Sequence, residues 1–163
     1  MRYLEGEEFE DAKVKMLMAA EQARMALCLR DKCGTAIYNG LVLVGLGYNA
    51  PPQDDIAHRK CLNEYAPTQK LKTDRTCCIH AEFRAITFAL KRETRDSLPG
   101  STLYFTRVDE EGNILFSGEP YCTACSKLAL DEEIAYFALW HEKGIALYDT
   151  AEYNDLSFIN AGT

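Results

Sequence analysis

Two short segments carry most of the information in this sequence: residues 77–82 read CCIHAE, and residues 119–125 read EPYCTAC. Each segment lies where the apolar spacing that follows it predicts the start of a helix. Together they offer one imidazole, from His80, and two thiolates, from Cys122 and Cys125. Three such ligands are typical of catalytic zinc, because they leave the fourth tetrahedral position open for water. The two segments therefore predict one Zn²⁺ site.

Glu82 is the expected general base beside this metal. His80 and Glu82 are two residues apart, and in the middle of a helix such side chains diverge by about 200°. They can serve one site only if it lies beyond the helix end, so we expect the zinc between two helix N-termini. The positive helix ends also stabilise thiolates at Cys122 and Cys125. From there, Glu82 can take a proton from a zinc-activated water and return it to a leaving amine.

Each motif alone has a simpler interpretation. A Cys-x-x-Cys pair can be a redox pair or half of a structural zinc site, and an isolated His-x-Glu carries almost no information. The order of the two motifs, with Pro120 ahead of the cysteines and a predicted helix after each motif, favours the catalytic interpretation.

The rest of the sequence alternates helical and strand-like segments. An amphipathic helix is expected over residues 7–30, with a core-facing stripe formed by Phe9, Val14, Leu17, Met18, Met25, Leu29 and the alanines between them. Asn39-Gly40 predicts a two-residue hairpin turn between strands at 35–38 and 41–48. Helix, strand, helix and strand then follow at 81–91, 102–106, 123–130 and 134–140. This order predicts an α/β protein with helices packed on one mixed sheet.

Two stretches stay without regular structure in this assignment. Residues 49–79 lack sustained periodicity and form a long irregular connection, a length that usually indicates function. The segment from His141 onward is ambiguous.

The composition predicts one soluble, cytoplasmic domain that spans residues 1–163. Hydrophobic residues make up 47% of the chain and charged residues 26%, which is typical of a packed globule. The longest apolar run, residues 134–140, is far shorter than the ~18 residues that cross a membrane. The acidic first residues argue against a signal or transit peptide. Seven cysteines then suggest thiols or metal ligands, and a net charge of −7 argues against nucleic acid as a partner.

On these residues, the sequence resembles the zinc-dependent cytidine and deoxycytidylate deaminase superfamily, whose signature is His-x-Glu followed by Pro-Cys-x-x-Cys. The likeness extends to STLYFT at 101–106 and to the opening helix. Gly47-Tyr48-Asn49, ahead of a long cysteine-containing loop, is most similar to the deoxycytidylate deaminase branch. The resemblance implies a three-layer α/β/α cytidine-deaminase-like sandwich with a mixed central sheet, and assembly as a homo-oligomer.

The resemblance also implies an activity: hydrolytic deamination of a free cytosine nucleotide or nucleoside, with deoxycytidylate first. It assigns zinc to His80, Cys122 and Cys125 and proton transfer to Glu82. It places Asn49 on the sugar and the backbone around Ala81 and Cys122 on the base. Asn49 equally fits the turn at a strand end.

Two other functions stay open. One is deamination of another base, namely guanine, adenine or adenosine in transfer RNA. The other is a catalytically silent zinc-binding module. Glu82 argues against the silent module, since a structural zinc site needs no general base.

The sequence departs from the family in two places. Tyr121 separates Pro120 from Cys122, where the family has proline next to cysteine. Residues 107–119 form an acidic insertion, which is expected to fold as a hairpin or flap near the pocket.

Residues 49–79 and their neighbours leave two further questions. Some members of the branch hold a second, structural zinc, but ordinary thiols are the favoured interpretation of the candidate ligands His58, Cys61, Cys77 and Cys78. The same segment has five basic against four acidic residues, so it is the most favourable place for a phosphate. The candidates there are Arg59, Lys60 and Arg75.

Overall fold

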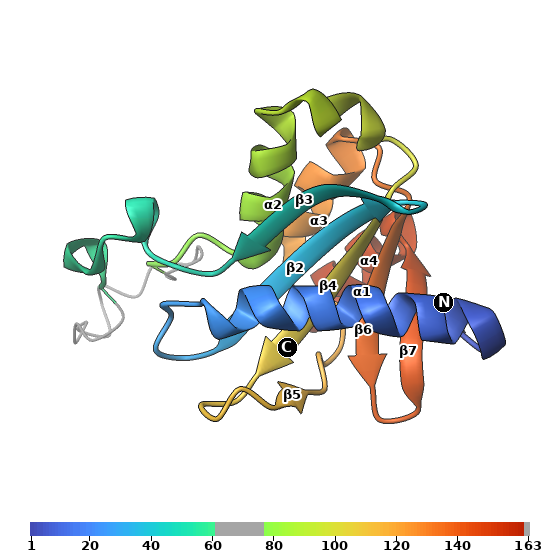
Figure 1. Cartoon of the computed structure of the whole chain (residues 1–163), viewed down its shortest axis with the longest axis horizontal. Helices are drawn as coiled ribbons and strands as arrows, with labels where there is room; N and C mark the ends of the chain where they lie inside the picture. The colour runs from blue at the N-terminus through green and yellow to red at the C-terminus, as the bar shows by residue number, and fades with distance from the viewer. Residues whose placement is uncertain (61–76, 162–163) are drawn as a thin grey trace.

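The computed structural model describes residues 1–60 and 77–161. Four α-helices are present in these ranges (Figure 1): Gly6–Arg24 (α1), Ala81–Leu90 (α2), Thr123–Asp131 (α3) and Thr150–Ala161 (α4). The strands are Arg2–Tyr3 (β1), Lys32–Asn39 (β2), Val42–Tyr48 (β3), Thr102–Val108 (β4), Ile114–Leu115 (β5), Tyr136–His141 (β6) and Gly144–Asp149 (β7). Short 3₁₀ turns occupy Pro52–Asp54, Ile56–His58 and Glu93–Ser97.

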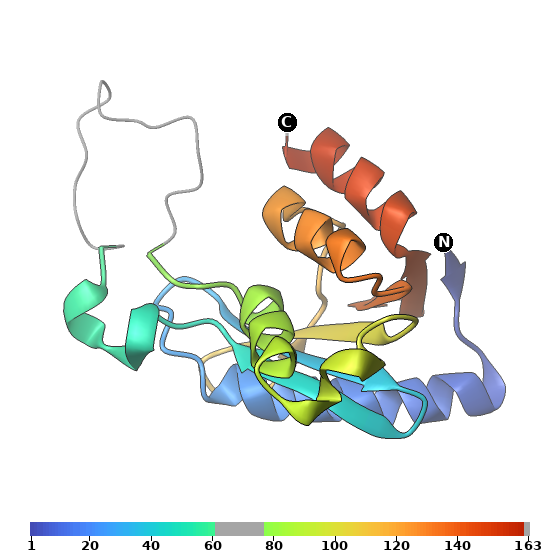
Figure 2. The same ribbon diagram turned by 90° about the horizontal axis from the view of Figure 1, so that it is seen from above.

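The seven strands form one mixed sheet in the order β1-β7-β6-β4-β2-β3, with β5 paired to β4 beside this path. β4 and β6 are parallel, whereas the other pairs are antiparallel. Figure 2 shows α1 on one face of the sheet and α2, α3 and α4 on the other. The three-layer α/β/α sandwich with a mixed central sheet is therefore confirmed.

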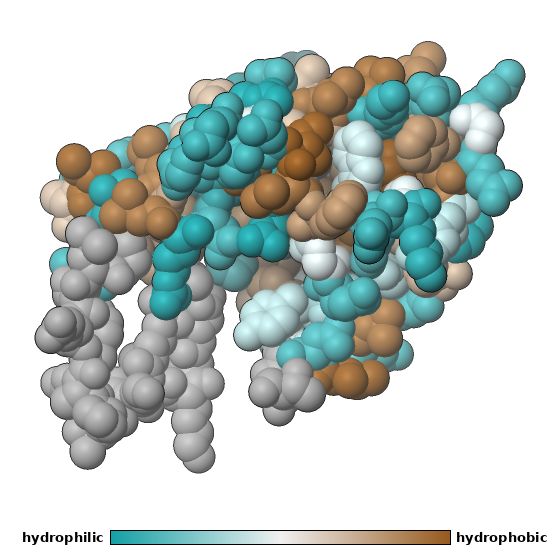
Figure 3. Space-filling view, turned by 90° about the horizontal axis from the view of Figure 1, so that it is seen from below, coloured by the Kyte–Doolittle hydropathy of each residue, from teal (hydrophilic) through white to brown (hydrophobic). Residues whose placement is uncertain are grey.

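Helix α1 differs from the expectation in both length and buried face. It ends at Arg24, not at residue 30. Its sheet-facing side is built mainly from alanines and Met16, whereas Val14, Leu17 and Met25 are exposed. Small side chains let the helix axis approach the sheet closely, so the larger apolar residues turn outward. Figure 3 shows apolar side chains interspersed with polar ones on one face of the molecule.

The β2–β3 hairpin forms as predicted, with a shift of one residue in its turn. Asn39 pairs with Val42, so the two-residue loop is Gly40-Leu41 and not Asn39-Gly40. Gly40 has φ 59°, which meets the need for positive φ at the first loop position. An irregularity between Ile37 and Tyr38 shifts the register within the hairpin.

Strand β3 packs directly against the start of α2, the helix that follows His80. A Cβ atom on Gly47 would lie 2.5 Å from the backbone nitrogen of Ala85 and closer still to the carbonyl oxygen of Ala81. Only glycine allows this approach. The contact fixes the first turn of α2 on the sheet.

The segment that was ambiguous from His141 onward forms strand β7 and helix α4. The ring of Tyr153, on α4, stacks on that of Phe137 in β6, with centroids 4.0 Å apart. The Asn160 side chain donates a hydrogen bond of 2.7 Å to the carbonyl oxygen of Pro120. Helix α4 therefore supports the loop that carries Cys122.

None of the helices in the described ranges is both long and apolar enough to cross a membrane.

Candidate metal and substrate site

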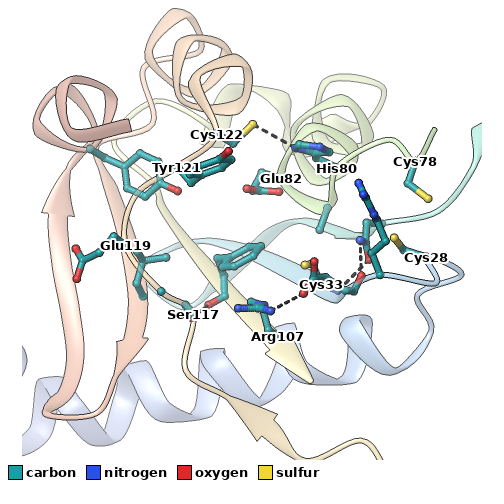
Figure 4. A pocket seen from close by; sticks show the side chains of 18 residues that line it. Cys28, Cys33, Cys78, His80, Glu82, Arg107, Ser117, Glu119, Tyr121 and Cys122 are labelled. Carbon is teal, nitrogen blue, oxygen red and sulfur yellow. Dashed lines mark hydrogen bonds and ion pairs between the residues drawn. The ribbon is translucent and has the colours of Figure 1, made fainter. Parts of the chain in front are cut away.

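His80, Cys122 and Cys125 lie together between the N-termini of α2 and α3. Figure 4 shows His80 and Cys122 facing each other. The Nδ1 atom of His80 is 3.2 Å from the Cys122 sulfur and 3.4 Å from the Cys125 sulfur. All three ligand atoms lie within 4.8 Å of one another. One imidazole nitrogen and two sulfurs at this spacing fit zinc, which prefers such donors. In residues 1–60 and 77–161 no other group of three such side chains is close enough to share an ion.

The backbone at the start of α3 contributes to this cluster. Cys122 is the residue that precedes the helix, and its sulfur accepts a hydrogen bond of 3.3 Å from the backbone N–H of Cys125. Hydrogen bonds from the Cys125 thiol and from His80 lower the pKa of Cys122 to about 4, against the opposing effect of burial. The hydrogen bond to Cys122 and burial raise the pKa of Cys125. The start of α3 therefore stabilises negative charge on the Cys122 sulfur.

Glu82 lies next to the cluster in the first turn of α2 (Figure 4). Its side chain is deeply buried, with 5% exposure. Burial and then the negative charge of Cys122 raise its pKa to about 7, while His80 lowers it. A carboxyl group with a pKa near neutrality can both accept and donate a proton under ordinary conditions.

A cavity of about 450 Å³ opens beside the cluster. This volume is within the range of small-molecule sites. The walls come from the loop before β2, the starts of α2 and α3, and residues 117–121. His80, Glu82 and Cys122 line one part of it, and Arg107 lies at the far side from them (Figure 4).

Asn49 and Ala81, the two residues expected to contact substrate, both line this cavity. Asn49 is buried and holds the backbone of the loop before β2. Its Oδ1 accepts from the N–H of Cys33 at 2.9 Å, and its Nδ2 donates to the carbonyl oxygen of Asp31 at 2.7 Å. One amide proton and one lone pair stay available. Ala81 is the first residue of α2, so its N–H has no acceptor within the helix.

Two of the three basic residues proposed for a phosphate, Arg59 and Lys60, lie outside the cavity lining. The Arg59 guanidinium donates to the carbonyl oxygen of Leu27. Arg75 lies outside the described residues. The cavity is instead lined by Arg30 and Arg107, which sequence reasoning missed. Arg30 lies two residues before β2, and Arg107 is the second-last residue of β4. A basic residue near the end of a strand is common on protein surfaces, so the sequence did not single them out.

The remaining cysteines are only partly accounted for. Cys61, a candidate for a second zinc site, lies outside the described residues. Cys28 and Cys33 are half-buried and line the cavity with Cys78.

The acidic insertion forms a wall of this cavity. Its first part extends β4 and pairs with β5, and Asp109 closes the turn by accepting hydrogen bonds from Asn113. Its last part, residues 117–119, lines the cavity. Ser117 is fixed there, because its hydroxyl donates to the carbonyl oxygen of Phe105 and accepts from the N–H of Trp140. The expected hairpin near the pocket is therefore present.

No protein-family model matches this chain, and no curated protein sequence matches it significantly. Solved structures do match. The dCMP deaminase of cyanophage S-TIM5 in apo form has a TM-score of 0.52 and 18% identity, over 78% of this chain and 80% of that chain. The same protein in complex with dCMP and dUMP has a TM-score of 0.53 and 20% identity, over 82% of this chain and 82% of that chain. The chain therefore has the fold of these deaminases, which confirms at the level of the fold the resemblance drawn from its two motifs.

Proposed function

We propose that this protein is a zinc-dependent hydrolytic deaminase that acts on a free cytosine nucleotide or nucleoside, with deoxycytidylate as the first choice. The observation that carries the proposal is the position of Glu82. Its carboxyl group is buried beside a His-Cys-Cys cluster and faces a cavity of small-molecule size. A structural metal site has no use for such a group.

His80, Cys122 and Cys125 would hold the zinc ion, which when bound makes water a good nucleophile near neutral pH. In the proposed reaction, a water oxygen would bond to the ring carbon that carries the amine. Glu82 would take one proton from this water and pass it to the ring nitrogen. It would then take the second proton from the new hydroxyl group and deliver it to the departing amine, so that the carbon–nitrogen bond breaks and ammonia leaves. The ring carbon keeps the oxygen as a carbonyl group.

Deoxycytidylate is the first choice for two reasons. The cyanophage protein with the same fold is a dCMP deaminase that was solved with dCMP and dUMP. The cavity also offers basic side chains, Arg30 and Arg107, that suit an anionic ligand. We propose that Asn49 contacts the sugar with its available amide proton and that the backbone around Ala81 and Cys122 contacts the base.

We propose further that the protein works in the cytoplasm as a homo-oligomer. Exposed apolar side chains on α1, such as Val14 and Leu17, support self-association. Light scattering on the purified protein tests this part, and a monomer at micromolar concentration would contradict it.

The experiment that tests the activity is a panel of cytosine, guanine and adenine compounds, each assayed for ammonia release by the zinc-loaded protein. Release from cytosine compounds alone supports the proposal. Release from guanine or adenine compounds alone would assign a deaminase with another substrate. Release from none of them would assign a silent zinc-binding module.

A further inference from the structure

At the far side of the cavity from His80 and Cys122, Arg107 forms an ion pair with Asp31 (Figure 4). Arg107 lies near the end of β4, and Asp31 is the last residue of the loop before β2. Both residues line the cavity, and both side chains are partly exposed to it or to solvent. The pair is thus accessible to a bound molecule.

Hydrogen bonds hold the backbone on both sides of this pair. Arg107 is paired with Cys33 in the β2–β4 ladder. The Asn49 side chain bonds to the backbone of both Asp31 and Cys33. A guanidinium group has five N–H donors, and the bond to Asp31 uses one Nη atom. Within residues 1–60 and 77–161, Asp31 is the side-chain partner of the Arg107 guanidinium, so further N–H donors are left for a ligand in the cavity.

We propose that Arg107 is the residue by which this site selects a 5′-phosphate, and that Asp31 holds it in place and competes with the phosphate for it. This proposal rests on the proposed function and deepens it. A base held at Glu82 would direct the sugar and its phosphate towards the far side of the cavity, where Arg107 lies. A phosphate monoester offers three acceptor oxygens and nearly two negative charges, which match the planar guanidinium fork better than one carboxylate does.

The charges around Arg107 agree with this assignment. Arg30 also lines the cavity, and it lies in the same loop as Asp31. The acidic residue Glu119 lines the cavity too, but Figure 4 shows it apart from Arg107. At this side of the cavity a phosphate would therefore meet two guanidinium groups, Arg30 and Arg107, against the one carboxylate of Asp31.

Arg107 is the first residue of the 107–119 insertion, and it lies outside both motifs, at 77–82 and 119–125. The proposed residue belongs to this chain's own departure from the family pattern. The insertion thereby has a function: it extends β4 far enough to carry a guanidinium group to the cavity wall.

The test compares nucleotide with nucleoside in both binding and turnover. Calorimetry gives the Kd of the zinc-loaded protein for deoxyuridylate and for deoxyuridine. Initial rates give kcat/KM for deoxycytidylate and for deoxycytidine. In each case the phosphate preference is the ratio of the two values.

We expect Arg107→Ala to lower this preference at least ~10-fold, which is the scale of a charge-assisted hydrogen bond. Arg107→Lys keeps the positive charge but not the planar guanidinium group, so this variant should lose part of the phosphate preference.

Asp31→Asn provides a second, opposite expectation. It removes the competing charge while keeping the backbone carbonyl that Asn49 uses, so the phosphate preference should rise about 2- to 5-fold. The matched control is Arg2→Ala, which removes an arginine from an exposed ion pair with Glu8. That control should keep the wild-type preference.

An unchanged preference in both Arg107 variants, or a lower preference in Asp31→Asn, would overturn the proposal. So would a wild-type protein that binds deoxyuridylate no better than deoxyuridine. If deoxyuridylate binds through Arg107 while no compound is deaminated, the proposed function fails and the phosphate site stands. If cytosine compounds are deaminated without a phosphate preference, the proposed function stands and the phosphate site fails.

Discussion

At the scale of single residues, Glu82 separates a catalytic zinc site from a structural one. Replacing its carboxyl group by an amide keeps the shape of the side chain but removes the proton acceptor. We therefore expect Glu82→Gln to retain zinc and fold while its turnover of deoxycytidylate falls at least ~100-fold, the usual scale for a positioned acid–base group. Initial rates and zinc content should be measured on the same sample. A rate near that of the wild type would refute the role of Glu82.

The metal ligands allow an equally direct prediction. Replacing both Cys122 and Cys125 by alanine removes two of three donors, so the variant should lose most of the about one zinc per chain that we expect. Elemental analysis of purified protein measures this content. Cys33→Ala is the matched control, because Cys33 lines the same cavity without joining the cluster, and it should keep its zinc. Full zinc occupancy in the double variant would contradict the assignment.

At this scale the sequence predicted those groups that a short motif holds together. His80 and Glu82 share one helix start, as do Cys122 and Cys125, so spacing alone constrained their geometry. Arg107 and Asp31 come from distant parts of the chain, and only the β2–β4 ladder brings them together. A contact between residues so far apart in the chain cannot be predicted from sequence spacing. Arg59 was suggested by local charge, but its guanidinium is bonded to the Leu27 carbonyl.

At the scale of secondary-structure elements, the contact of β3 with α2 positions the metal site. Gly47→Ala would force a methyl group into the backbone of α2, whose first turn follows His80. We expect a loss of about 2 kcal/mol in the free energy of unfolding, in the middle of the range that is typical for overpacking. Urea denaturation followed by circular dichroism measures the loss.

Gly40→Ala serves as the comparison for this prediction. Gly40 has positive φ but nothing within 4 Å of its Cβ position, so alanine there meets only backbone strain. The expected cost is about 1 kcal/mol. A Gly47→Ala variant that is as stable as Gly40→Ala would contradict the close packing of β3 on α2.

Element prediction succeeded where local signals and tertiary contacts agree. The β2–β3 hairpin and the helices after the two motifs have strong turn or spacing signals. In α1, large and small apolar residues both follow the helical spacing, but it is mainly the alanines and Met16 that pack on the sheet. In α4, Tyr153 and Ser157 are buried while Phe158 and Ile159 are exposed, so hydrophobicity alone could not reveal its orientation.

At the scale of the whole molecule, charge should separate free nucleotides from polynucleotides. The net charge is −7, and the 107–119 insertion at the cavity wall has one arginine against four acidic residues. A strand of phosphates would meet this repulsion repeatedly, whereas one phosphate needs only one favourable contact. We expect a cytosine-containing oligonucleotide to be deaminated at least ~100-fold less efficiently than deoxycytidylate, compared as kcat/KM at two salt concentrations. Efficient, salt-sensitive deamination of the oligonucleotide with little activity on the small compounds would contradict this expectation.

The central claim is that one zinc ion, held by His80, Cys122 and Cys125, makes this fold a deaminase. The most direct measurement is the rate of conversion of deoxycytidylate to deoxyuridylate as zinc is returned in steps to chelator-treated protein. We expect no conversion without zinc and a rate that rises linearly until about one zinc per chain is bound. Conversion by the zinc-free protein, or none of any cytosine compound at full zinc occupancy, would contradict it.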